Sequence, residues 1–160
     1  MMGEHQIYNA CLAIEVLSVL GIDYPFIKSG LEKMKLIGRF EKLSENIYVD
    51  GGHNPQGAKS ISETVEFHSI ESPVFIVSMV KDKDMKNYLE ILEKKGKVIL
   101  TSFDSALCHD PSEFPQFETV SFDDAVKISK ANKDKTYIFC GSLYQINLVI
   151  SAVSPTRTIN

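Results

Sequence analysis

The sequence has few cysteines, no long hydrophobic run and no excess of positive charge, and each absence excludes a class of protein. Its three cysteines are far apart, with no CxxC pair, so we expect free thiols in a reducing compartment and no zinc site. No apolar run approaches the roughly 20 residues that a membrane-spanning helix needs. The net charge is −4 and the lysines are scattered among acids, which leaves room for a local phosphate site only. We therefore expect neither nucleic acid nor a membrane as a partner.

The composition is that of a globular protein. The chain has 160 residues, of which 44% are hydrophobic and 24% charged, enough to bury the core of one domain or of one domain with an appendage. The first ten residues show neither the charged region nor the apolar region of a signal peptide, so we expect a cytoplasmic location.

The first part of the chain has a helical pattern. Apolar residues recur at helical spacing from His5 to Leu20, and Gly21 follows as a C-terminal stop. A shorter amphipathic helix begins near Pro25 and is expected to end near Gly38. Two helices in this order look like the tail of a larger domain.

After the second helix, strands alternate with helices. We expect strands at 46–50, 73–79, 97–103, 118–120 and 136–140, and helices at 55–68, 85–95, 122–132 and from 142 onward. Several strands are nearly continuous apolar runs, which is typical of parallel strands covered on both faces. The pattern predicts an α/β fold with a doubly wound, mostly parallel sheet, preceded by two helices. Ligands should bind beyond the carboxyl ends of the strands.

The stretch "IYVDGGHNPQGAKSI" contains the strongest candidate site. Asp50 stands at the end of an expected strand, and the two glycines after it let the backbone turn sharply and approach a ligand. Asn54 followed by proline indicates a helix N-cap and first turn, an end that favours an anion. His53 beside it can donate to a phosphate or stack on a base. The alternative is that these residues only form a turn.

Five motifs in order resemble one family. They are "GRFEKL", "VDGGHNPQGAKSISET", "VKDKD", "TSFD" and "CGSLY", and together with "GEHQIYNACLAIEVL" they extend over nearly the whole chain. The sequence resembles the ATP-dependent Mur ligases and, more closely, folylpolyglutamate synthase with its bifunctional dihydrofolate synthase relatives.

The resemblance implies an amide-forming ligase. In such a reaction ATP, with Mg²⁺, phosphorylates a carboxylate of folate or dihydropteroate, and the amine of L-glutamate attacks the acyl phosphate. Residues 1–37 would be the tail of the central ATP-binding domain, and residues 38–160 the C-terminal glutamate-binding ligase domain. The sequence has no GxxxxGK[ST] P-loop, so we expect a fragment that is inactive alone. The metal ligands would lie in the absent part, and we expect the full-length enzyme to be a monomer.

The resemblance also assigns residues to the nucleotide. Arg39 would contact the ATP phosphates, where a guanidinium suits bidentate binding, although it can also be a solvated linker charge. Asp50 would lie on the nucleotide side of the cleft, or be only a turn acid. His53 would lie near the phosphates or the glutamate, with Asn54 as cap and contact. His5 would contact the nucleotide, and Asp50 and His53 are the catalytic candidates.

The resemblance assigns three further residues to glutamate. The resemblance places a carboxylate of glutamate near Ser142, which can equally be only an N-cap. Asp82 and Lys83 would meet the amine or a phosphate, or merely form a charged helix start. We expect Tyr144 to pack in the core.

The sequence departs from the family pattern at two positions, and it contains one run that resembles a catalytic triad. The family commonly has alanine at Gly52 and often glycine at Ser78. The run from Cys108 to Asp110 resembles a nucleophile, a base and an orienting acid, but adjacent loop side chains seldom point at one another, so we expect no triad.

Two other functions stay open. A Mur ligase proper would add an amino acid to a UDP-muramyl precursor, but the loop after "VKDKD" has no extended recognition insert. A binding module without catalysis would also lack the P-loop, but it would not explain the resemblance of the first helix to a central-domain helix.

Overall fold

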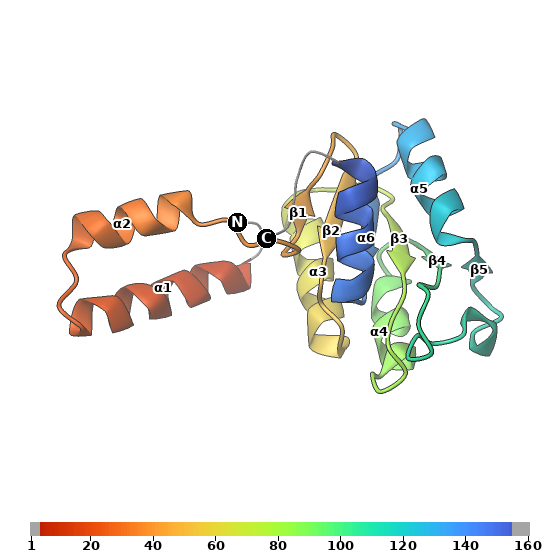
Figure 1. The fold of residues 1–160 in the computed structure, drawn as a ribbon, viewed down its shortest axis with the longest axis horizontal. Coiled ribbons are helices and arrows are strands. Elements are labelled where there is room, and N and C mark those ends of the chain that lie inside the picture. The colour runs from red at the N-terminus through yellow and green to blue at the C-terminus, as the bar shows by residue number, and fades with distance from the viewer. Residues whose placement is uncertain (1–3, 155–160) are drawn as a thin grey trace.

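The computed structural model describes the backbone of residues 4–154 and the side chains from Gln6 onward, which form a helical hairpin and an α/β domain (Figure 1). The hairpin consists of α1 (Glu4–Val19) and α2 (Tyr24–Lys33) and projects away from the rest. The domain contains β1 (Glu41–Lys42), β2 (Ile47–Asp50), α3 (Pro55–Phe67), β3 (Val74–Val77), α4 (Met85–Leu92), β4 (Lys97–Leu100), η1 (Pro111–Glu113), β5 (Glu118–Thr119), α5 (Phe122–Ala131), β6 (Tyr137–Cys140) and α6 (Leu143–Val153).

The six strands form one sheet in the order β1-β2-β6-β3-β4-β5. Only β1 is antiparallel to its neighbour, and the other pairs are parallel. This confirms the predicted doubly wound, mostly parallel fold. The last strand, β6, lies between β2 and β3. The connection from β2 to β3, which contains α3, therefore crosses over β6, a strand that comes much later in the sequence.

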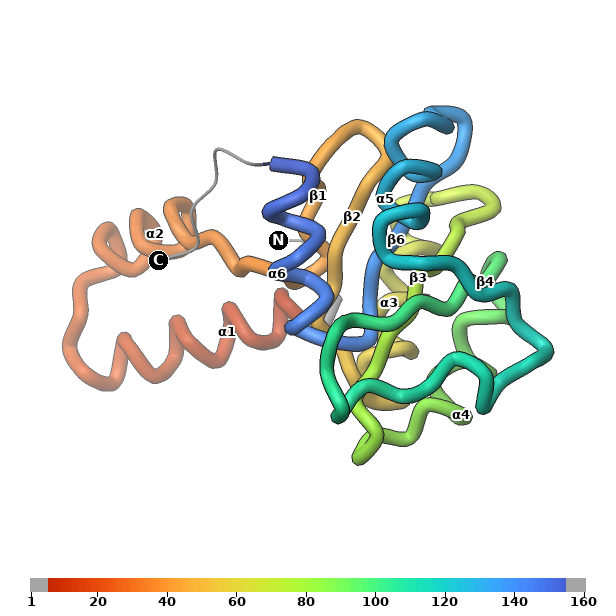
Figure 2. The backbone as a smooth tube through the Cα atoms, turned by 45° about the vertical axis from the view of Figure 1, so that its right-hand side comes forward, coloured from red at the N-terminus to blue at the C-terminus, as the bar shows by residue number. Residues whose placement is uncertain are grey.

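Helices cover both faces of the sheet. One buried cluster joins α3 and α4 to the sheet through side chains such as Ile61 and Leu89. The other joins α5 and α6 to the opposite face through side chains such as Val126 and Val149. Figure 2 shows α6, in dark blue, running alongside β2. The strands are apolar on both faces because both faces are covered.

Capping residues fix where the helices of the domain begin. Asn54, Asp84, Ser121 and Ser142 each occupy the N-cap and accept a hydrogen bond from a backbone amide in the first turn. Such bonds satisfy amides that have no partner inside the helix. The predicted helix starts at residues 55, 85 and 122 are confirmed.

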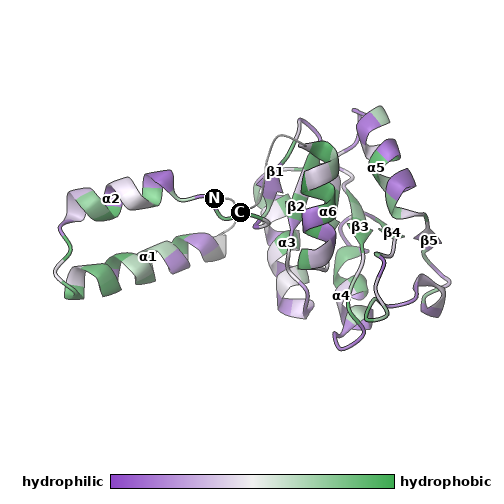
Figure 3. Cartoon of the chain, viewed as in Figure 1, coloured by the Kyte–Doolittle hydropathy of each residue, from purple (hydrophilic) through white to green (hydrophobic). Residues whose placement is uncertain are grey.

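The hairpin differs from the domain in its burial. Apolar side chains on α1 and α2 are exposed, among them Leu12 (66%), Val19 (81%) and Phe26 (71%), and Figure 3 shows the apolar stretch along α1. From residue 6 to residue 37, only Gln6 and Ile27 are buried. The hydrophobic core therefore belongs to the domain. No helix in the described part of the chain has the length and apolarity needed to cross a membrane.

The second helix is shorter than predicted. It ends at Lys33, and Met34 after it is extended with ψ 130°. Gly38, the expected stop, lies in a separate turn with φ +67°, where its amide donates to a carboxylate oxygen of Glu41. Gly38 does mark a change of backbone direction, but the change is the turn that leads into β1 and not the end of α2. β1 has only two residues, and sequence periodicity does not reveal it.

Candidate functional site

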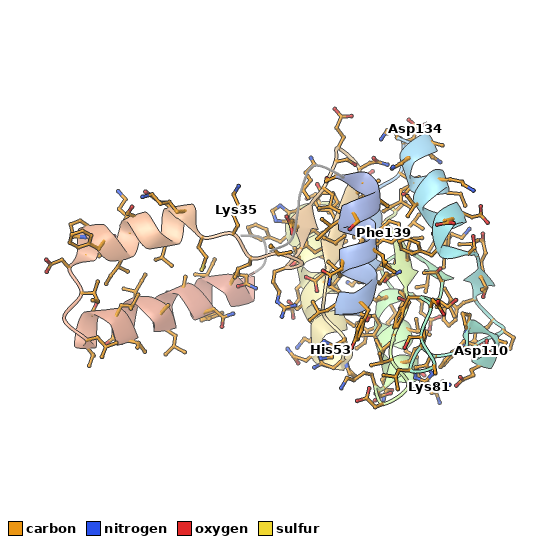
Figure 4. All side chains as sticks on the ribbon, viewed as in Figure 1. Lys35, His53, Lys81, Asp110, Asp134 and Phe139 are labelled. Atoms are coloured by element: carbon orange, nitrogen blue, oxygen red, sulfur yellow. The ribbon has the colours of Figure 1, made fainter. Side chains whose placement is uncertain are left out.

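The candidate site lies at the carboxyl edge of the central strands. Asp50, Cys140 and Val77 are in register at the ends of β2, β6 and β3, so the loops after these strands start at one edge. Figure 4 shows His53 and Lys81, which belong to two of these loops, at the same end of the molecule. The predicted ligand-binding edge and the motif residues therefore coincide.

Asp50 ties this edge to the start of the domain. Its Oδ2 accepts a hydrogen bond from the amide of Phe40 at 2.8 Å, and its Oδ1 accepts one from the amide of Gly52 at 2.7 Å. The residue is 8% exposed. The amide of Gly51 also donates to the carbonyl of Gly38 at 2.7 Å. The observed role of Asp50 is thus to hold the turn to the segment that leads into β1, and its contact with a nucleotide stays a prediction.

The glycines after Asp50 are needed for close packing and not for a left-handed backbone, since neither has a positive φ. A Cβ on Gly51 would collide with Leu143 of α6. A Cβ on Gly52 would stand 3.1 Å from the Cα of Gly57 and 2.9 Å from Oδ1 of Asp50. Besides the sharp turn that the sequence predicts, close packing is therefore a second reason for these glycines.

His53 is held by its own turn. Its Nδ1 lies 3.0 Å from the carbonyl oxygen of Gly51. Because a carbonyl oxygen only accepts hydrogen bonds, Nδ1 must carry the proton in this contact. In the neutral ring Nε2 is then an acceptor, and in the protonated ring it is a donor. The turn therefore sets the tautomer of a side chain at the edge of the sheet.

The first cleft at this edge has a volume of about 290 Å³. It is lined by Arg39, Asp50, Gly51, Gly52, His53, Asn54, Gln56, Gly57, Ser60 and Glu63. The structure thus brings together Arg39, Asp50, His53 and Asn54, all predicted for the nucleotide. Asn54 also caps α3, with its Oδ1 accepting from the amide of Gly57 at 2.8 Å. The side chain of His5 lies outside the described residues.

A second, smaller cleft of about 160 Å³ shares His53 with the first. It is lined by His53, Val80, Lys83, Gly141, Ser142, Leu143 and Tyr144. His53, Lys83 and Ser142, all predicted for glutamate, therefore meet here. Asp82 is not among the lining residues; its side chain is 71% exposed and pairs with Nζ of Lys83 at 3.1 Å. The hydroxyl of Ser142 accepts from the amide of Tyr144 at 3.2 Å, as an N-cap does.

The prediction that Tyr144 packs in the core is wrong. The buried face of α6 falls on Gln145, Ile146, Val149 and Ile150, which turns position 144 outward. Tyr144 is 63% exposed, and its ring stacks on that of Phe103 at a centroid distance of 5.7 Å. It forms part of the wall of the second cleft.

Tyr88 is a residue of the site that sequence reasoning missed. It lies in α4, has no exposed surface, and its hydroxyl donates to the carbonyl oxygen of Gly52 at 2.9 Å. Burial, followed by the proximity of Cys140 and Asp50, raises the pKa of Tyr88 well above its usual value. Burial likewise raises the pKa of Cys140 to about 12. The spacing of Tyr88 with apolar neighbours in α4 marks it as a core residue, but no sequence signal indicates which carbonyl it reaches.

The side chains of the run from Cys108 to Asp110 form no catalytic triad, as predicted. Nδ1 of His109 lies 3.3 Å from a carboxylate oxygen of Glu113, while Asp110 caps η1. Burial raises the pKa of the Cys108 thiol, which opposes a nucleophilic role. The three side chains thus serve different partners.

The described residues offer no cluster of three or more His, Cys, Asp or Glu side chains that could hold a metal ion. We therefore assign no metal ligand to this part of the chain.

Comparison with known proteins places the chain in a family. Residues 38–143 match the family model described as "Mur ligase, glutamate ligase domain". The dihydrofolate synthase/folylpolyglutamate synthase of Bacillus subtilis (strain 168) is 31% identical over 166 residues, which cover 92% of this chain and 39% of that relative. The UDP-N-acetylmuramoyl-L-alanyl-D-glutamate--2,6-diaminopimelate ligase of Caldanaerobacter subterraneus subsp. tengcongensis is 28% identical over 69% of this chain and 24% of its own length.

A solved structure has the same fold. The Mycobacterium tuberculosis folylpolyglutamate synthase, complexed with ADP and AMPPCP, superimposes with a TM-score of 0.86 at 23% identity, over 100% of this chain and 42% of that protein. The chain therefore spans about two fifths of the length of the proteins that it resembles in sequence and in fold. Since the family model covers well over half of its residues, the chain belongs to the glutamate ligase domain family of the Mur ligases.

Proposed function

We propose that this chain is the C-terminal portion of an ATP-dependent ligase that adds L-glutamate to folate through an acyl-phosphate intermediate. The relative from B. subtilis, named dihydrofolate synthase/folylpolyglutamate synthase, supports this choice because the similarity covers 92% of the chain. The fold likeness to a folylpolyglutamate synthase complexed with ADP and AMPPCP supports a nucleotide as one substrate. On this proposal residues 1–37 end the central ATP-binding domain and residues 38–160 form the glutamate-binding domain.

The observation that carries the proposal is that His53 lines both clefts. A ligase of this kind must bring a phosphorylated carboxylate and an amine together while excluding water, because an acyl phosphate hydrolyses readily. Two adjoining clefts that share one histidine suit such a reaction. We assign the first cleft to the ATP side and the second to glutamate.

The first cleft has the chemistry of a phosphate site. Arg39 lies over the turn, since a Cβ on Gly51 would come within 3.1 Å of its Nη1. Its guanidinium can bind phosphate oxygens in a bidentate manner. The N-terminus of α3 opens into the same cleft, and the positive end of its dipole favours an anion. Asp50 would act by holding this arrangement in place.

The second cleft suits an amino acid. The ammonium group of Lys83 and the N-terminus of α6 at Ser142 both favour a carboxylate of glutamate. When the amine attacks the acyl carbon, the bond from that carbon to the phosphate oxygen breaks and the phosphate leaves with the bonding electrons. Nε2 of His53 can take the proton that the amine gives up, because Nδ1 already carries one.

The proposed reaction uses Mg²⁺ together with ATP. The described residues hold no candidate metal cluster, so we assign to this chain only roles in binding, orientation and proton transfer.

The test is phosphate release from ATP by the full-length ligase that contains this chain, with tetrahydrofolate and glutamate as substrates. We expect release that needs both substrates and that falls by about 10²-fold or more in His53→Ala. His68→Ala is the matched control, because His68 is exposed and caps the opposite end of α3; its release should stay within about twofold, as for a surface substitution. Unchanged release in His53→Ala would refute the assigned role. Dihydropteroate in place of the folate tests for the second acceptor.

A second candidate is a Mur ligase that adds an amino acid to a UDP-muramyl precursor. The 28% identity to the diaminopimelate ligase of Caldanaerobacter favours it over unrelated functions. Phosphate release that requires a muramyl nucleotide, and not a folate, would establish this candidate. No release with either acceptor would favour a binding module without catalysis.

We also propose that the 160-residue chain alone has no ligase activity, because its sequence lacks a P-loop for the ATP phosphates. Glutamate-dependent phosphate release by this polypeptide alone would overturn that proposal.

A further inference from the structure

Gly52, the residue before His53, is held from three sides. The amide of Gly52 donates to Asp50, its Cα packs against Gly57, and its carbonyl oxygen accepts from Tyr88 at 2.9 Å. The first two contacts come from the turn and the start of α3. The third comes from α4, a helix that contributes no residue to the lining of the first cleft.

This carbonyl has a direct bearing on His53. The oxygen of Gly52 and the amide nitrogen of His53 belong to one planar peptide unit. A hydrogen bond that fixes the oxygen therefore fixes the direction in which the chain enters His53. The ring of His53 is in turn tied to the carbonyl of Gly51, one peptide earlier, at 3.0 Å. A rotation of the Gly52–His53 peptide would move the ring away from this acceptor.

We propose that Tyr88 is a positioning residue for His53: its buried hydroxyl locks the Gly52–His53 peptide, and so keeps the Nδ1 proton of His53 on the Gly51 carbonyl and Nε2 available between the two clefts. The effect on the His53 ring stands on the geometry alone. The effect on catalysis rests on the ligase function proposed above.

The surroundings keep Tyr88 in the role of a donor. Burial raises the pKa values of both Tyr88 and its neighbour Cys140, so the phenol and the thiol are uncharged at neutral pH. A neutral phenol keeps its proton and donates it to the carbonyl, whereas a phenolate could not. Tyr88 therefore donates this hydrogen bond over the whole physiological pH range.

Tyr88→Phe tests the proposal because it removes the hydroxyl and keeps the ring. Tyr137→Phe is the matched control: Tyr137 is also buried, at 2% exposed, but it lies at the opposite end of β6 from the site. The primary readout is the ¹⁵N NMR signal of the two ring nitrogens of His53 in the chain labelled at histidine. These signals report which nitrogen carries the proton.

For the neutral form of the ring, recorded at alkaline pH, we expect the proton on Nδ1 in the wild-type chain and in Tyr137→Phe. In Tyr88→Phe we expect the signals to move toward a mixture of the two tautomers. Identical His53 signals in all three proteins would overturn the proposal. If Tyr88→Phe does not fold, the wild-type chain still tests the proposal: a neutral His53 ring whose proton lies on Nε2 and not on Nδ1 would overturn it.

The second readout is steady-state kinetics of the full-length ligase. We expect Tyr88→Phe to lower kcat by about 10-fold, as misplacement of a reacting group does, with the KM values for ATP and glutamate within about twofold of wild type. Tyr137→Phe should change neither parameter. A tautomer shift without any ligase activity in the wild type would refute the proposed function and leave the positioning role standing. An active ligase whose kcat and His53 signals are unaffected by Tyr88→Phe would refute the positioning role alone.

Discussion

Two turns at the same edge of the sheet, after β2 and after β6, are fixed by different means. The turn after β2 is held by side-chain contacts with distant segments: Asp50 accepts a hydrogen bond from the amide of Phe40, and Tyr88 of α4 donates one to the carbonyl of Gly52. The turn after β6 is held by backbone conformation: Gly141 has φ +102°, and a Cβ there would stand 2.5 Å from the carbonyl oxygen of Ser78. The turn carrying His53 thus depends on side-chain contacts with distant segments as well as on closely packed glycines, whereas its neighbour depends on a glycine with a positive φ.

The largest effect that distinguishes the turns should come from adding a methyl group to a glycine in each. Gly141→Ala combines an unfavourable left-handed residue with a backbone clash, and we expect it to lower the free energy of unfolding by about 3 kcal/mol. Gly52→Ala faces only tight contacts at a normal φ, so about 1 kcal/mol is expected. Urea denaturation of both variants measures this difference. Equal losses would mean that backbone conformation does not separate the turns.

The next effect is a loss of stability at alkaline pH. Folding raises the pKa of Cys140, which ends β6, from 9.0 to about 12, and it raises that of Tyr88 as well. At alkaline pH the folded state holds protons that the unfolded chain releases. The contribution of the protonated thiol to the free energy of unfolding is therefore complete below pH 9 and is lost as the pH rises toward 12. Each group should add a slope of about −1.4 kcal/mol per pH unit to the free energy of unfolding.

Cys140→Ala should flatten that slope, as seen in denaturation curves recorded from pH 8 upward. Cys11→Ala is the control, because Cys11 is exposed. A slope that is the same in Cys140→Ala and in wild type would contradict the burial of this thiol as its cause.

The N-caps should give a smaller difference. Ser142 is 4% exposed, so Ser142→Ala leaves a partly buried amide of α6 without its partner and should cost about 2 kcal/mol. Asn54 is exposed, and water can replace its cap, so Asn54→Ala should cost about 1 kcal/mol. Thermal unfolding of the two variants provides the measurement. If Asn54→Ala proved the more damaging, the turn after β2 would depend on its cap more than on Asp50 and Tyr88.

The smallest effect on stability should come from His53 itself. Its ring is partly exposed and makes one hydrogen bond within its own turn, so His53→Ala should change the free energy of unfolding by less than about 0.5 kcal/mol. The same variant is expected to lose ligase activity. A loss of stability near 2 kcal/mol would make His53 a structural residue and would leave its kinetic effect without a catalytic meaning.

The elements of the fold could be predicted because they depend on local patterns. Apolar strands, helical spacing and capping residues predict the positions of β2 to β6 and of α3 to α6, and the motif residues Arg39, His53 and Asn54 do line one cleft. The order of the strands could not be predicted, because no local pattern indicates that β6 lies between β2 and β3.

The features of the site that the sequence did not predict also depend on contacts between distant segments and not on local patterns. Whether Tyr144 faces the core depends on the rotation of α6 against the sheet, and the carbonyl that Tyr88 reaches depends on how α4 packs beside α3. The glycines after Asp50 were recognised as special, but their contacts with Leu143 and Gly57 exist only in the folded chain.

The position of β6 also governs the order in which the domain can assemble. β6 pairs with β2 on one side and with β3 on the other, yet it is synthesised after every other strand. Until Tyr137 to Cys140 leave the ribosome, β2 and β3 have unpaired edges facing the empty centre of the sheet, and such edges invite pairing with other chains. The sheet is therefore completed in a late step that joins distant segments, which should make folding slow and make a chain that stalls before β6 prone to aggregate.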